Sequence, residues 1–233
     1  MSPKTEEQLL AINRRFYAEF AQSFAESRGS PQPGFQRLLD FLPGEVDRVA
    51  DVGCGNGRFG LFLSEHLAGF EYIGIDFTEG FLDLAAAALN GNFLQRDISR
   101  SSYLAGLGGF DLCICLATLQ HIPGKARRRA ALHEMADHLL PMGRIFLSSW
   151  QFAHSERQKR KIVSWSEAGI RTEEVDHGDY LVSWQRNGRG LRYVHQIDSA
   201  EIAELARDAG LEVLGEFRSD GREGDLNLYS ILA

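Results

Sequence analysis

Hydrophobic side chains follow two different spacings along the chain. Near the N-terminus they recur at steps of three and four, as from Leu9 through Phe16 to Phe24, which predicts a helix over residues 5–27. A turn-rich break and a short predicted helix, residues 35–42, come next. From residue 48 onward, short apolar runs alternate with helical patterns, so the chain changes there to an alternation of strands and helices.

The alternating part contains five expected strands, at residues 48–53, 71–76, 92–97, 110–116 and 143–149. Three helices are expected between them, at residues 59–67, 78–89 and 125–140. Short links between such units predict a parallel sheet with helices on both faces. The run at 110–116 is apolar nearly throughout, which is typical of a central strand buried on both faces.

The alternation lapses after Trp150, where residues 151–198 are polar and charged. A helix is then expected at 199–209, followed by two closing strands, 211–217 and 226–232, whose closeness predicts an antiparallel hairpin at a sheet edge. We therefore expect one α/β domain over residues 1–233. Within it, residues 1–43 form a helical lid and residues 151–198 an insertion on the substrate side.

Composition narrows the functional classes. Of the 233 residues, 44% are hydrophobic and 24% charged, which is ordinary for a globular domain, and the formal net charge of −7 gives no global attraction to nucleic acid or membranes. The three cysteines lack zinc spacing and a disulfide pattern, so no metal site is expected. No signal peptide or membrane span is apparent, and we expect a cytoplasmic protein.

A glycine-rich loop, Asp51 to Gly57, follows the first expected strand and precedes a helix. Glycines there allow a tight turn and close approach of a ligand to the backbone, at the edge where open α/β sheets bind ligands. Asp76 ends the second strand, where it can accept hydrogen bonds from ribose hydroxyls, and Asp97 ends the third, near an adenine edge. The pattern predicts a nucleotide-type cofactor.

A nicotinamide oxidoreductase is the least favoured interpretation. Residues 55–60 formally satisfy G-x-G-x-x-G. However, Asp51 would repel a pyrophosphate, Gly53 is an additional upstream glycine, and the dinucleotide pattern does not require Asp97.

The order of these segments resembles the class I S-adenosylmethionine-dependent methyltransferases, over roughly residues 45–150 and the closing strands. That resemblance implies a Rossmann-like, seven-stranded, mostly parallel sheet with an antiparallel last strand. It also implies S-adenosylmethionine as cofactor and S-adenosylhomocysteine as product. The glycine loop would pack on the methionine part, Asp76 would bind the ribose and Asp97 the adenine. The cofactor site so implied comprises Tyr17, Arg28, Asp51, Gly53, Gly55, Gly57, Asp76, Phe77, Asp97, Ile98 and Leu116.

A narrower resemblance is to the tRNA wobble-uridine carboxymethyl O-methyltransferases and their bacterial relatives, carried by residues 17–42, 110–122, 144–150 and 192–209. Family members carry an Arg-Tyr-Tyr-His-like segment, which here is Arg-Tyr-Val-His at residues 192–195. The chain departs from the family at Val194, at Ser183 in place of proline, and at Gln120 in place of a histidine, all in the expected substrate region. The resemblance implies a carboxylate acceptor on tRNA and, as in some members, a small activating protein partner.

Three residues are candidates for the catalytic side. Arg192 can hold a carboxylate in bidentate geometry, or be surface charge. Tyr193 can position the acceptor, or be a packed strand residue; His121 can be a base, or a pocket wall. In the N-terminal segment, Tyr17 and Arg28 can close over the cofactor, with Arg28 pairing with its carboxylate.

Two basic clusters, residues 127–129 and 157–161, can contact phosphates or form solvated helix faces. Tryptophans 150, 165 and 184 can stack a base or form the core of a lid. Beside the tRNA interpretation, two alternatives stay open. One is a small-molecule O- or N-methyltransferase, and the other is a non-catalytic cofactor-binding subunit that activates a partner.

Overall fold

A seven-stranded sheet is the frame of the protein. The structure is a computed structural model that describes residues 1–27 and 30–233. The strands lie in the order β3-β2-β1-β4-β5-β10-β9, and β10 runs antiparallel to both of its neighbours. Their bounds are β1 Arg48–Val52, β2 Glu71–Asp76, β3 Asn92–Gln95, β4 Phe110–Leu116, β5 Leu139–Trp150, β9 Val213–Ser219 and β10 Asn227–Leu232. This confirms the predicted fold class, including the antiparallel last strand.

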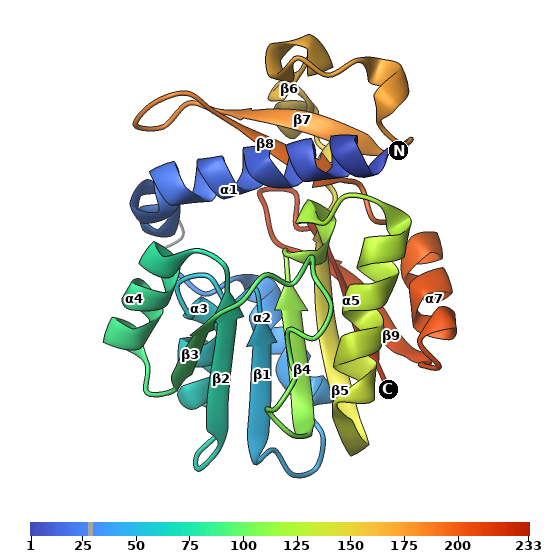
Figure 1. Ribbon diagram of the computed structural model, residues 1–233. Helices are drawn as coiled ribbons and strands as arrows, with labels where there is room; N and C mark the ends of the chain where they lie inside the picture. The colour runs from blue at the N-terminus through green and yellow to red at the C-terminus, as the bar shows by residue number, and fades with distance from the viewer. Residues whose placement is uncertain (28–29) are drawn as a thin grey trace.

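Helices cover both faces of this sheet (Figure 1). Helices α5 and α7 pack on one face, whereas α2 and α3 pack on the other, and α4 lies beside β2 and β3. The α-helices of the sheet layers are α2 Pro33–Leu38, α3 Arg58–Ser64, α4 Glu79–Ala88, α5 Lys125–Asp137 and α7 Ser199–Asp208, and 3₁₀ turns lie at Leu39–Phe41 and Leu119–His121.

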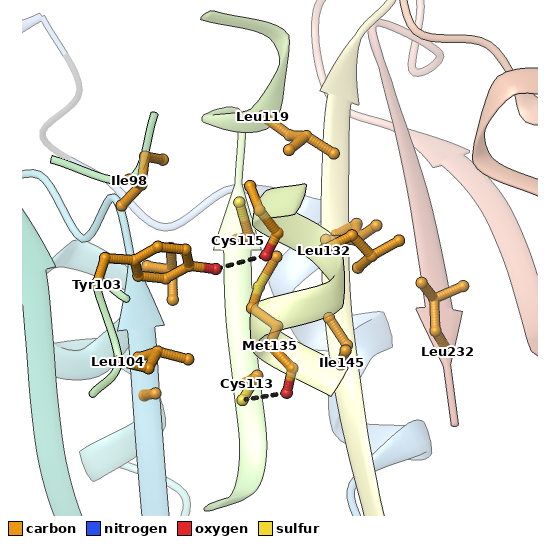
Figure 2. Packing of buried hydrophobic residues seen from close by; sticks show 14 of the residues in the cluster. Ile98, Tyr103, Leu104, Cys113, Cys115, Leu119, Leu132, Met135, Ile145 and Leu232 are labelled. Carbon is orange, nitrogen blue, oxygen red and sulfur yellow. Dashed lines mark hydrogen bonds between the residues drawn. The ribbon is translucent and has the colours of Figure 1, made fainter. Parts of the chain in front are cut away.

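Strand β4 is the centre of the core. Cys113 and Cys115 point toward Leu132 and Met135 of α5 (Figure 2), while the alternate side chains of the strand pack on the opposite layer. The Cys113 thiol donates to the carbonyl oxygen of Met135 at 3.9 Å. All three cysteines are free and buried, as expected for core residues. The continuous apolar pattern of this strand therefore reflects burial on both faces.

The boundary between α5 and β5 differs from the sequence-based expectation. The helix ends at Asp137 rather than at residue 140, and β5 begins at Leu139, before Pro141 and Gly143. The strand accommodates Pro141 in its first, exposed part, where the pairing with β4 is irregular between Phe110 and Leu112. Proline is tolerated at such a strand end because no ladder hydrogen bond is required of it.

Residues 151–198 contain a second sheet where no regular elements were predicted. Its three antiparallel strands are β6 Ile162–Val163, β7 Asp179–Trp184 and β8 Gly190–His195, and we call it the small sheet. The turn between β7 and β8 contains Asn187 and Gly188, both with positive φ. The remaining elements of this segment are α6 Glu156–Lys159 and 3₁₀ turns at Phe152–His154, Trp165–Ala168 and Thr172–Glu174.

Helix α1, Pro3–Glu26, lies between the two sheets (Figure 1). It crosses the carboxyl ends of the main strands, with the small sheet on its other side. Asn13, near its middle and 3% exposed, donates from Nδ2 to the carbonyl oxygens of His121 (3.2 Å) and Tyr193 (3.1 Å). Its Oδ1 accepts from the Tyr193 backbone N–H at 2.8 Å. One amide thus joins α1 to both the main domain and the small sheet.

A buried ionic network also connects the small sheet to the helical layer. His195 contacts Asp179 through Nδ1 (2.7 Å) and Glu201 of α7 through Nε2 (2.9 Å). Glu201 also accepts from Nε of Arg128 on α5. Burial lowers the pKa of His195, but the hydrogen bonds to the two carboxylates outweigh it, so the pKa is raised above the ordinary value.

Substitution His195→Gln should destabilise the protein by about 3 kcal/mol, because it leaves buried Asp179 without its cation and Glu201 with Arg128 alone. A group with a raised folded-state pKa contributes its stability fully below the unfolded pKa and loses it as pH rises through the folded value. The free energy of unfolding in urea should therefore differ more between wild type and variant at about pH 6 than at about pH 9. An equal difference at both would contradict the ionic role of His195.

Candidate active site

A cavity of about 400 Å³ opens at the carboxyl edge of the main sheet, bounded by α1 on the opposite side. It collects residues from the ends of β1, β2, β4 and β5 and from the small sheet. The predicted site residues that line it are Tyr17, Asp51, Gly53, Gly55, Asp76, Phe77, Asp97, Ile98, Leu116, His121 and Arg192. Arg28 lies outside the described residues.

The glycine loop is shaped differently at each of its glycines. Gly53 has φ +77° and no room for a side chain, since a Cβ there would lie 2.2 Å from the Thr118 side chain. Gly55, with φ +54°, leaves open space where a Cβ would stand. Gly57 does not line the cavity; it precedes α3 with φ +72° and packs on Ala85. In the structure Gly57 turns the chain into α3, and its contact with the cofactor stays a prediction.

Asp76 fixes the loop from the end of β2. Its carboxylate accepts from the backbone N–H groups of Gly55 (3.0 Å) and Thr78 (2.8 Å). Burial raises the pKa of Asp76, against the lowering effect of these two donors. Each carboxylate oxygen has further acceptor capacity, which suits a ligand with two adjacent hydroxyls.

Asp51 is 3% exposed and accepts a hydrogen bond from the Tyr72 hydroxyl at 2.7 Å. Burial raises its pKa to about 7, and the nearby Asp76 adds to the shift, while the Tyr72 hydroxyl opposes it. A carboxyl group with this pKa changes its charge readily when a cation binds beside it. This end of the cavity is therefore suited to a positively charged ligand.

Asp97 lines the same cavity and forms an ion pair with Arg14 of α1. It accepts from the Ser99 N–H and hydroxyl and from Nη2 of Arg14, the last at 2.6 Å. Burial alone would raise its pKa, but the hydrogen bonds from Ser99 and Arg14 lower it below the ordinary value. Arg14 was not predicted from the sequence, because nothing in a helical pattern indicates which distant acid a basic residue meets.

Arg192 lines the same cavity from β8 of the small sheet. It is 4% exposed, and its Cζ lies 4.9 Å from the ring centre of Phe16, 5.2 Å from Phe24, and 5.7 Å from both Trp150 and Trp184. Among the described residues no carboxylate forms an ion pair with it, and its buried Nε has no hydrogen-bond partner there. Four aromatic faces thus surround a guanidinium that retains an unused donor.

Tyr193 faces away from the cavity, which corrects its assignment as a catalytic residue. Successive side chains of a strand point to opposite faces, so Arg192 reaches the cavity while Tyr193 points to the far side of β8. The Tyr193 side chain is fully buried among Leu9, Trp165 and other apolar residues, and its hydroxyl donates to Asp179. Only its backbone supports the site, through Asn13 and His121.

His121 is held in one tautomer. Its Nδ1 lies 3.0 Å from the Tyr193 carbonyl oxygen, which can only accept, so the neutral ring carries its proton on Nδ1. Nε2 then accepts from the Tyr17 hydroxyl at 3.1 Å. The pair places a basic nitrogen and a phenol in the cavity wall.

The two basic clusters have different surroundings. Arg127, Arg128 and Arg129 each pair with an acid, and Arg128 is 2% exposed, so this cluster is a set of structural ion pairs. In residues 157–161, Arg157, Lys159 and Arg160 are exposed beside the cavity, which Gln158 and Lys161 line. Across residues 1–27 and 30–233, no cluster of side chains suits a metal ion.

Comparison with known proteins identifies the family. A profile described as a methyltransferase domain matches residues 49–143. A protein of Encephalitozoon cuniculi that is named as a methyltransferase is 30% identical to this chain over 200 residues. The match covers 86% of this chain and 87% of that protein. The chain belongs to the class I S-adenosylmethionine-dependent methyltransferases.

Further matches extend this result. The tRNA (carboxymethyluridine(34)-5-O)-methyltransferase ALKBH8 of Macaca fascicularis is 28% identical over 69% of this chain, which spans only 24% of that protein. The ubiquinone biosynthesis O-methyltransferase of Azoarcus is 29% identical over 76% of the chain and 70% of its own length. A solved S-adenosylmethionine-dependent methyltransferase from Clostridium acetobutylicum has the same fold, with a TM-score of 0.65 and 13% identity, covering 93% of this chain and 98% of that one.

The described residues of the methyltransferase fit its cofactor, S-adenosylmethionine. Gly55 leaves space at the loop, Asp76 offers a diol site, and Asp51 and Asp76 supply carboxylates next to a cationic ligand. No helix in the part of the chain that the structure describes has the length and apolar character needed to cross a membrane.

Affinity of the methyltransferase for S-adenosylmethionine should rise with pH up to about 7 and then level off. Below that pH the Asp51 carboxyl is protonated in the free protein. Because the positive sulfonium favours the ionised form of Asp51, binding of the cofactor releases a proton. Titration calorimetry between about pH 6 and about pH 8 measures the effect.

In the Asp51→Asn variant the rise should disappear, and S-adenosylhomocysteine, which lacks the sulfonium charge, should show a smaller rise on wild type. Parallel pH profiles for wild type and variant would mean that Asp51 does not sense the charge of the cofactor.

Proposed function

We propose that this methyltransferase esterifies a carboxylate, and that its acceptor is a carboxymethyl group like that of a tRNA wobble uridine. The observation that carries the proposal is the guanidinium of Arg192, which lies among four aromatic rings and is buried in the wall of the cavity. Among the described residues, no carboxylate forms an ion pair with it. A buried cation is stabilised best by an anion that can be bidentate, and a carboxylate acceptor would supply one.

The chemistry makes modest demands on the protein. When bound, S-adenosylmethionine would supply a sulfonium methyl group, whose carbon a carboxylate oxygen of the acceptor would attack as the carbon–sulfur bond breaks, giving a methyl ester and S-adenosylhomocysteine. Because the acceptor is already ionised, no protein base has to remove a proton. The chain contributes alignment: Arg192 would hold the acceptor, while the aromatic walls exclude water from it.

Two features favour an RNA-borne acceptor. The exposed cations Arg157, Lys159 and Arg160 flank the cavity wall, where they would meet the phosphates of a bound strand. Trp150 and Trp184 line the cavity beside Arg192, which lies over a face of each ring, and a base could pack against their remaining surface. The similarity to ALKBH8 of Macaca fascicularis adds weight, although it covers only part of that protein. A small activating protein partner stays part of this proposal.

A hydroxyl acceptor is the second candidate, favoured by a different observation. Nε2 of His121 and the Tyr17 hydroxyl form a hydrogen-bonded pair at the cavity, which can take a proton from an acceptor hydroxyl. The similarity to the Azoarcus ubiquinone biosynthesis O-methyltransferase fits this candidate. It would make the protein a small-molecule methyltransferase with the same cofactor site.

The first experiment supplies methyl-tritiated S-adenosylmethionine to an extract of the source cell lacking this gene, with and without the purified protein. Products are separated into RNA, protein and small molecules, and the RNA is treated with mild base. Base-labile label in small RNA would support the ester on tRNA. Label confined to small molecules would support the second candidate, and cofactor binding without transfer would support a non-catalytic subunit.

Substitution Arg192→Lys should reduce turnover on a carboxylate acceptor by about a hundredfold, because lysine keeps the charge but loses the planar fork. The affinity for S-adenosylmethionine should stay within about threefold of wild type, since the guanidinium comes from β8 of the small sheet and the glycine loop from β1 of the main sheet. Single-turnover transfer and calorimetry measure the two effects. Loss of cofactor binding in the variant would contradict the assignment of Arg192 to the acceptor side.

A further inference from the structure

Gln158 presents a buried, unused amide oxygen to the cavity. Its side chain lines the cavity and the residue is 4% exposed. Oε1 has no hydrogen-bond partner among the described residues. A buried amide oxygen without a partner costs free energy, and an apolar side chain of similar size would fill the space without that cost.

The local backbone explains why this side chain points inward. Ser155 begins the single turn of α6, where its carbonyl oxygen accepts from the N–H of Gln158 at 2.9 Å. The Gln158 carbonyl then accepts from the N–H of Lys161, also at 2.9 Å. The turn exposes Arg157 and Lys159 to solvent, so Gln158 is its inward-facing residue. Its backbone is satisfied, and only the side-chain oxygen is left.

Three residues that line the cavity, Thr78, Gln158 and Arg192, each have a buried side-chain polar atom without a partner among the described residues, and those of Arg192 and Gln158 are of opposite kind. Nε of Arg192 is a donor without a partner, and Oε1 of Gln158 is an acceptor without a partner. Both residues line the cavity together with the rings of Trp150 and Trp184. A ligand that satisfies both atoms carries an anion, a hydrogen-bond donor, and a flat body that fits between aromatic side chains.

We propose that Gln158 determines acceptor specificity by accepting a hydrogen bond from an N–H or O–H group on the ring that carries the acceptor carboxylate. This rests on the proposed carboxylate methylation, which assigns the guanidinium of Arg192 to the carboxylate. It adds a substrate class: a carboxylate attached to a planar ring that has a donor of its own. An acceptor lacking that donor leaves Oε1 buried and unpaired and is rejected for that reason.

The probe is an anticodon stem–loop RNA containing 5-carboxymethyluridine, whose ring has one N–H, paired with a counterpart methylated at that nitrogen. Wild type and Gln158→Met, which is close in size but has no amide, are assayed on both for methyl transfer. Gln158→Met should lower kcat/KM on the first RNA by about tenfold or more. On the methylated RNA the two proteins should differ by no more than about threefold.

Two further measurements separate a specificity role from a structural one. The affinity for S-adenosylmethionine should be nearly unchanged in Gln158→Met, and the melting temperature should be unchanged or higher, because the variant removes a buried oxygen that has no partner. Gln158→Asn, which keeps the amide but retracts it, should fall between wild type and Gln158→Met on the first RNA. If Gln158→Met does not fold, wild type alone must still prefer the RNA with the free N–H.

The outcomes distinguish the two proposals. Transfer by wild type to the carboxylate, with Gln158→Met equal to wild type on both RNAs, would overturn the role of Gln158 and leave carboxylate methylation in place. A wild-type enzyme that labels hydroxyl acceptors and neither RNA would overturn the proposed function itself. A loss of activity in Gln158→Met that is the same on both RNAs would also overturn the donor-reading role.

Discussion

The side-chain amide of Asn13 is the contact on which the arrangement of the active site depends. It makes three hydrogen bonds in a buried position, one to the loop after β4 and two to β8. An apolar residue there would leave the Tyr193 N–H and C=O with fewer partners, in a place that water does not reach. Because the amide faces both sheets, α1 becomes a wall that the main domain and the small sheet share (Figure 1).

From that shared wall, one helix supplies side chains to both ends of the cavity. Arg14 reaches Asp97 at the cofactor end, Tyr17 meets His121, and Phe16 and Phe24 face the guanidinium of Arg192. The charges enter the cavity from different elements, with the carboxylates of Asp51 and Asp76 near the ends of β1 and β2 and the guanidinium of Arg192 on β8. Under the proposed function, a cationic methyl donor would meet the carboxylates and an anionic acceptor the guanidinium, which would orient both before any reaction.

The sequence predicted the main sheet because it rests on local patterns. Apolar runs mark the buried parallel strands, and the two acids expected to bind the cofactor follow from those strands, since Asp76 ends β2 and Asp97 lies two residues after the end of β3. The small sheet was missed because residues 151–198 as a whole are polar and charged, although Asn187-Gly188 is a hairpin signal that was available. Tyr193 was misassigned, since a one-residue change along β8 reverses the face of a side chain.

Asn13 and Gln158 had no local signal at all, because their roles arise from groups distant in the sequence that only the folded chain brings to them. The same holds for Arg14, whose acid lies 83 positions along the chain. Such buried polar residues look like ordinary surface positions of a helix or turn. Their partners, or the lack of one, are visible only in three dimensions.

Two arginines among the described residues of the methyltransferase are almost completely buried, and their surroundings differ. Arg128 and Arg192 are 2% and 4% exposed. Arg128 donates to the Glu201 carboxylate and to the Ile122 carbonyl oxygen, as a buried guanidinium ordinarily requires. Arg192 instead has aromatic rings around it and an unpaired Nε. A protein acid at that position would neutralise Arg192 permanently, whereas aromatic faces stabilise the cation and leave its donors to a ligand that arrives and departs.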